Sequence, residues 1–167
     1  MTRRVEVDPS RDPIRIPSHI FDELCQHARE AEPEECCGLI IGNSLDRYHR
    51  LVRCRNEMTA RHEEDPVVYP RDGRAAFYMN EHDYLEAWRA AEEAGKQITA
   101  VYHSHVGAGA YLSELDLAYA ENRFFPFPKA DQIVIPVFEG AARWRDVGVF
   151  RRDGASFIGH TVEWIDA

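Results

Sequence analysis

The sequence predicts an α/β fold with a mixed β-sheet in one domain, and three observations support this prediction. Segments with helical apolar spacing alternate with short β-branched runs, and the chain finishes in strands. A length of 167 residues is enough for one buried core. A hydrophobic fraction of 44% and a charged fraction of 29% are ordinary for globular domains. We expect a flexible polar tail over residues 1–12 and a single domain over residues 13–167.

The first half of the chain is predicted to hold a strand, a helix, a hairpin and a long loop. The helix begins with Ser18 as its N-cap, because the apolar residues that follow recur at helical spacing, and it ends before Pro33. Thr59–Gly73 is polar, acidic and interrupted by proline, which is typical of a loop, and loops of this length are often functional. The predicted strands here are Ile14–Pro17, Gly38–Gly42 and Tyr48–Met58, and the last two form the hairpin.

The second half is predicted to hold two helices and several strands. Asn80 caps a helix that ends at Gly95, and a further helix begins at Ser113. Between them, Ile98–His105 is rich in β-branched and aromatic residues, which indicates a central strand. The remaining predicted strands are Ala75–Met79, Gln132–Phe138, Ala142–Arg151 and Ser156–Trp164.

Composition excludes several classes of function. The net charge of −9 disfavours a nucleic-acid binder, which would carry a basic patch. The longest apolar runs are far shorter than the roughly 20 residues that span a bilayer. The N-terminal residues lack the apolar stretch of a secretory signal, and the four cysteines contain no C-x-x-C pair. We therefore expect a cytoplasmic protein whose partners include neither nucleic acid nor membrane.

One cluster of residues carries possible chemistry. His103 and His105 are two apart in a predicted strand, so both imidazoles point to the same side. Ser113 and Asp116 share one face of the first turn of the next helix. Two imidazoles and a carboxylate are a plausible three-ligand set for a divalent metal in an open, catalytic site. Taken separately, the histidines are as readily structural, and Ser113 with Asp116 is an ordinary helix start.

The order of these residues resembles that of a known family. The motif H-S-H-x7-S-x2-D, preceded far upstream by P-E-E-C-C-G-L-I-I-G, is similar to the pattern of the JAMM (MPN+) metalloproteases. The resemblance extends over Ile14–Phe138. It implies a mixed sheet flanked by helices, in a cytidine-deaminase-like architecture. Val106 and Leu112 stand where many family members have proline, and neither position is a ligand.

The resemblance also implies the roles of individual residues. His103, His105 and Asp116 would bind one zinc ion, while Glu35 would be the general base that activates water. Ser113 would help to hold that water or the oxyanion. Glu34 is the alternative base if the motif is displaced by one residue.

The small bacterial-type members that this chain resembles include peptidases that trim ubiquitin-like sulfur-carrier proteins after a Gly-Gly tail. We therefore expect a zinc-dependent peptidase or isopeptidase with such a carrier as its substrate. Two alternatives remain open. One is a non-catalytic scaffold of the same fold, and the other is a zinc amidase acting on a small molecule or peptide.

Overall fold

A computed structural model describes residues 3–166 of the chain. Its centre is a six-stranded mixed sheet with the order β4-β3-β5-β7-β8-β9. Neighbouring strands run antiparallel except for β5 and β7, which are parallel. The predicted α/β fold with a mixed sheet is confirmed. The strands of this sheet are β3 (Cys37–Gly42), β4 (Arg50–Cys54), β5 (Gln97–Val106), β7 (Asp131–Val137), β8 (Gly148–Asp153) and β9 (Ser156–His160).

Two small sheets fasten the ends of the chain to this centre. β1 (Val5–Glu6) pairs with β6 (Tyr111–Leu112), just before the predicted helix at Ser113. β2 (Ile14–Pro17) pairs in parallel with β10 (Val162–Ile165). Part of the predicted N-terminal tail is therefore held by strand pairing, while residues 1 and 2 lie outside the described part of the chain.

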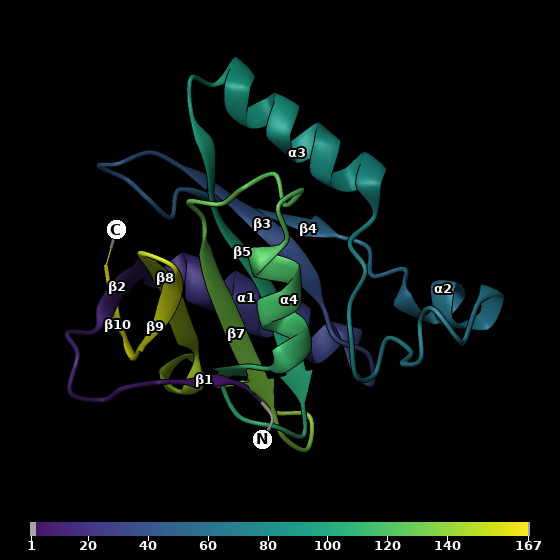
Figure 1. Cartoon of the computed structure of the whole chain (residues 1–167). Coiled ribbons are helices and arrows are strands. Elements are labelled where there is room, and N and C mark those ends of the chain that lie inside the picture. The colour runs from purple at the N-terminus through teal and green to yellow at the C-terminus, as the bar shows by residue number, and fades with distance from the viewer. Residues whose placement is uncertain (1–2, 167) are drawn as a thin grey trace.

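Helices cover both faces of the main sheet (Figure 1). α1 (Ser18–Ala31) packs on one face, and α3 (Glu81–Glu93) and α4 (Glu114–Glu121) lie on the other. α2 (Met58–Glu64) projects to one side, and η1 (Trp144–Asp146) is a short 3-10 turn. Within residues 3–166, no helix combines the length and the apolarity that crossing a membrane requires.

The central strand β5 distributes its side chains between these two layers. Ala100 and Tyr102 join the apolar core beneath α1, whereas Val101 joins the core beneath α3. Because successive side chains of a strand alternate, His103 and His105 continue the row of Val101. Both histidines therefore belong to the face that α3 and α4 cover.

The predicted loop and the strand after it are corrected by the structure. Thr59–Gly73 is not a continuous loop, because α2 occupies its first part. This helix buries none of its residues, so it has no apolar periodicity that a sequence could reveal. Ala75–Met79 is not a strand of any sheet, and it has only an isolated bridge between Met79 and Asn56.

Several boundaries also differ from the predictions. The predicted strand Tyr48–Met58 is shorter, because β4 ends at Cys54 and Met58 begins α2. Pro17, not Ser18, is the N-cap of α1, and no side chain caps that helix. The predicted strand Ala142–Arg151 is interrupted, because residues 144–146 form η1 and β8 begins only at Gly148. The predicted strand Ser156–Trp164 is two strands, β9 and β10, which belong to different sheets. In the predicted strands 142–151 and 156–164, the alternation of apolar residues continues where the backbone turns, so the sequence pattern does not reveal the break.

Candidate metal centre

The structure brings the two histidines and the aspartate of the motif together in the interior. Nε2 of His103 lies 3.2 Å from Nε2 of His105 and 3.2 Å from Oδ1 of Asp116. Nε2 of His105 lies 3.2 Å from Oδ2 of Asp116. All three side chains are buried, with His103 only 1% exposed. Three potential ligand atoms thus converge on one point at the end of β5.

The start of α4 orients the aspartate. Ser113 is the N-cap, and its Oγ accepts a hydrogen bond from the Asp116 backbone N–H at 3.1 Å. In return, Oδ2 of Asp116 accepts from the Ser113 backbone N–H at 2.9 Å. This reciprocal capping box fixes the carboxylate while Oδ1 faces His103. Ser113 thus has the ordinary helix-start role, and its hydroxyl hydrogen has no acceptor among residues 3–166.

The hydrogen bonding of His105 determines which nitrogen faces the cluster as an acceptor. Its Nδ1 lies 2.9 Å from the carbonyl oxygen of Gly109. A carbonyl can only accept, so Nδ1 carries the hydrogen, and in the neutral imidazole Nε2 is then the atom with a lone pair facing the cluster. His103 has no partner at its Nδ1 among the described residues.

The spacing of these atoms fits a zinc ion. Tetrahedral zinc with bonds of about 2.0–2.1 Å places its ligand atoms about 3.3 Å apart. The two Nε2 atoms are 3.2 Å apart, and each lies 3.2 Å from a different oxygen of Asp116. Burial alone would raise the pKa of the Asp116 carboxyl, but His103 and His105 outweigh it and hold that pKa well below its usual range. The donor set is therefore one carboxylate and two imidazoles, which suits a divalent cation.

Glu35 lies on the same face as the two histidines. Cys37 pairs with His103 in the antiparallel ladder, and the Ser104 N–H donates to the Cys36 carbonyl at 3.1 Å, so the ladder continues toward Glu35. Strand alternation then places Glu35 on the histidine side. The side chain is 6% exposed. Burial raises the pKa of its carboxyl to about 7, with smaller opposing effects from His103 and Asp116.

Glu34 has a different environment. Its Oε1 accepts a hydrogen bond from the Thr59 hydroxyl at 2.5 Å, and the Thr59 oxygen in turn accepts from the Gly73 N–H at 2.9 Å. Glu34 therefore holds the chain around residues 59–73, away from the ligand cluster. This arrangement supports Glu35 over Glu34 as the acid of the site.

Two aromatic contacts to the cluster were not predicted from the sequence. The ring of Phe77 stacks on His103 with centroids 4.8 Å apart and planes 28° apart. The ring of Tyr111 lies 4.9 Å from that of His105. Phe77 comes from a segment outside the motif, and Tyr111 occupies one of its seven unspecified positions, so the motif itself predicts neither contact. No cysteine among the described residues joins the cluster.

An apolar groove of about 350 Å³ lies between the segment after α2 and the start of α4. Two of its lining residues are sequence neighbours of the candidate site, because Ala76 precedes the stacked Phe77 and Leu115 precedes Asp116. The groove is lined by Met58, Val68, Tyr69, Pro70, Arg71, Ala76, Glu114, Leu115 and Ala118.

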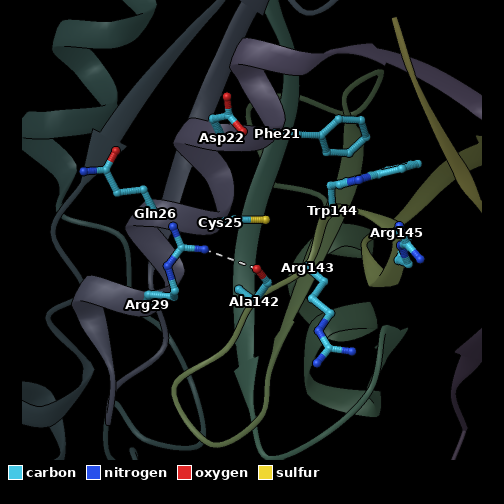
Figure 2. Close-up of a pocket in the computed structure, with 9 residues that line it drawn as sticks. All are labelled: Phe21, Asp22, Cys25, Gln26, Arg29, Ala142, Arg143, Trp144 and Arg145. Carbon is cyan, nitrogen blue, oxygen red and sulfur yellow. Dashed lines mark hydrogen bonds between the residues drawn. The ribbon is translucent and has the colours of Figure 1, made fainter.

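A larger cavity of about 550 Å³ lies on the other face of the sheet, between α1 and the segment around η1 (Figure 2). The rings of Phe21 and Trp144 pack together at its edge, with centroids 5.6 Å apart, and Arg29 donates to the Ala142 carbonyl at 3.2 Å. Size therefore does not identify the site, since the converging ligand atoms are on the opposite side of β5.

Comparison with known families agrees with this geometry. The family model Prok-JAB, described as prokaryotic homologs of the JAB domain, matches residues 17–146. The chain belongs to the Prok-JAB family. The matched range contains Glu35, both histidines, Ser113 and Asp116, and the resemblance to JAMM/MPN proteins is confirmed.

Individual relatives of this Prok-JAB protein are moderately similar. The CysO-cysteine peptidase of Mycobacterium tuberculosis is 30% identical over 106 residues, which cover 63% of this chain and 64% of that protein. Tail tip assembly protein K of Escherichia phage N15 is 32% identical over 107 residues, which cover 64% of this chain and 36% of that protein. A solution structure of a Desulfitobacterium hafniense protein is similar in fold, with a TM-score of 0.67 at 19% identity, covering 92% of this chain and 94% of that one.

Proposed function

We propose that this Prok-JAB protein is a zinc-dependent peptidase that cleaves the bond after the C-terminal Gly-Gly of a ubiquitin-like or sulfur-carrier protein. The observation that carries the proposal is the convergence of three buried side chains beside a buried glutamate, with the two imidazole Nε2 atoms 3.2 Å apart and each 3.2 Å from an oxygen of Asp116. A relative named CysO-cysteine peptidase supports a peptidase activity and a carrier substrate.

His103, His105 and Asp116 would hold the zinc ion. When bound, zinc would polarise the scissile carbonyl and lower the pKa of water to about 7. Glu35 would accept the proton of the attacking water and pass it to the leaving amine, and a carboxyl with a pKa of about 7 suits both transfers. The Ser113 hydroxyl keeps a hydrogen that can be donated to the oxyanion.

The groove beside the centre supports a polypeptide substrate. It is largely apolar, and its wall is formed by Met58 and residues 68–71, so we expect the segment 59–73 to border the bound substrate. The ligands themselves are buried, so the scissile bond must approach through a narrow opening. Glycines allow a backbone to approach closely, since they have no side chain.

A panel of substrates tests the proposal. The zinc-loaded protein is incubated with carriers that end in Gly-Gly-Cys, with the same carriers ending in Ala-Ala-Cys, and with small amides, and products are identified by mass spectrometry. We expect cleavage after Gly-Gly only. Turnover of small amides alone would indicate an amidase, and bound zinc without turnover on any substrate would indicate a scaffold; either result contradicts the proposal.

A further inference from the structure

The carboxylate of Glu35 has no hydrogen-bond partner among residues 3–166, so its direction depends on how its backbone is held. The Glu35 N–H donates to the Gly73 carbonyl at 2.7 Å. The Glu35 carbonyl accepts from Nδ2 of Asn56 at 3.0 Å. One residue later, the Cys36 N–H donates to Oγ of Ser104 at 2.7 Å. Of these contacts, the one from Asn56 is the only one made by a side chain to Glu35 itself.

Asn56 uses the full hydrogen-bonding capacity of its amide. Besides Glu35, Nδ2 donates to the Ala76 carbonyl at 3.2 Å. Its Oδ1 accepts from the N–H of Tyr78 at 2.9 Å and from the N–H of Met58 at 3.0 Å. Two donors and two acceptors are what a carboxamide offers. All four partners are backbone groups.

These four bonds join both sides of the metal centre. Ala76 and Tyr78 flank Phe77, whose ring stacks on His103 at 4.8 Å. The same side chain therefore holds the backbone of Glu35 and the backbone on either side of the aromatic wall of His103. Aspartate would have the same shape but no donor, and it would place a carboxylate against two carbonyl oxygens.

We propose that Asn56 is a positioning residue that sets the distance between Glu35 and the metal-binding face of β5, an inference that rests on the proposed function. Substitutions of groups that orient a metal site commonly reduce activity by about 10- to 100-fold. Asn56 supplies none of the three ligands and does not line the groove, although it bonds the backbones of two lining residues, Met58 and Ala76. Loss of Asn56 should therefore lower kcat more strongly than it changes KM, and leave zinc content unchanged.

The matched pair Asn56→Asp and Asn43→Asp tests this inference in the zinc-loaded protein. Oδ1 of Asn43 also accepts from two backbone N–H groups, those of Leu45 and Asp46, but its Nδ2 donates to no group among the described residues, so aspartate can replace it. We expect Asn56→Asp to lower kcat by about tenfold or more, with KM within about twofold of wild type. Asn43→Asp should leave both constants unchanged. If Asn56→Asp does not fold, the uncharged Asn56→Ala takes its place.

Amide hydrogen exchange gives a second readout that needs no substrate. The Glu35 amide should exchange about tenfold faster in Asn56→Asp, while amides of β7 and β8 keep their protection. If Asn56→Asp changes neither kcat nor the exchange rate of the Glu35 amide, the inference is overturned. An equal rise in the exchange rate of every amide would also overturn it, because it would indicate a global loss of stability. If wild type cleaves nothing but the local exchange effect is present, the proposed function fails and the positioning network stands.

Discussion

Histidines on the two sides of β5 lie in opposite electrostatic settings: His27 of α1 is half-buried, and His103 of β5 is fully buried. On the α1 face, Nδ1 of His27 lies 2.7 Å from the Tyr102 hydroxyl, and burial together with nearby Arg53 lowers the pKa of His27 to about 4. On the α4 face, burial again acts to lower the pKa of His103, but Asp116 outweighs it and raises that pKa. Burial and a nearby cation therefore favour a neutral packing histidine at His27. A carboxylate that meets two imidazoles makes a candidate cation site around His103.

The largest expected effect is on the α4 face. His103→Ala, His105→Ala and Asp116→Ala each remove one of three protein ligands, so each variant should lose most of its zinc and its turnover. Wild type should bind about one zinc per chain, which elemental analysis of the dialysed proteins measures. Full zinc occupancy in all three variants would refute the assignment of the centre.

The α1 face should respond in stability and not in metal binding. A Cβ added at Gly38 would lie 2.4 Å from the buried Tyr102 ring, and that ring cannot move without disturbing the core. Gly38→Ala should therefore lower the free energy of unfolding by about 1–3 kcal/mol, the usual cost of overpacking. Urea denaturation measures this loss, and the folded fraction should still bind zinc. A Gly38→Ala protein as stable as wild type would contradict the tight packing of Gly38 against Tyr102 on the α1 face.

The smallest expected effect at neutral pH concerns His27, whose contribution to stability changes only on acidification. Its pKa is about 4 in the folded chain against 6.5 without the fold, so the unfolded state binds more protons between these values. The stabilisation by neutral His27 is complete above pH 6.5 and is lost as the pH falls toward 4. His27→Gln keeps a partner for Tyr102 but does not titrate in this range. The difference in unfolding free energy between wild type and His27→Gln should therefore shift against wild type on acidification, and a pH-independent difference would contradict the shift.

The sequence predicts those features of the fold that depend on neighbouring residues. The β5 strand follows from its β-branched alternation, and the helix starts at Asn80 and Ser113 follow from side chains that accept the N–H groups of the first turn. The ligand set is predictable for the same reason, because both histidines and Asp116 lie within one strand–loop–helix unit.

Features that depend on distant backbone groups could not be predicted. The role of Asn56 arises from four main-chain partners in three segments, and no side-chain pattern records them. Phe77 lies in a stretch whose apolar character predicted a strand, whereas its ring actually covers His103. The turn at Trp144 was missed because its apolar side chain continues the alternation while packing against Phe21.

The most direct test of the central claim compares Glu35→Gln with Glu34→Gln. Glutamine keeps the shape of Glu35 but cannot take the proton of water, so turnover on a Gly-Gly carrier should fall by about 10²-fold or more. Zinc content and thermal stability should stay near wild type. Glu34→Gln can still accept from the Thr59 hydroxyl, so it should remain active. An inactive Glu34→Gln beside an active Glu35→Gln, or full activity in both with zinc bound, would contradict Glu35 as the base.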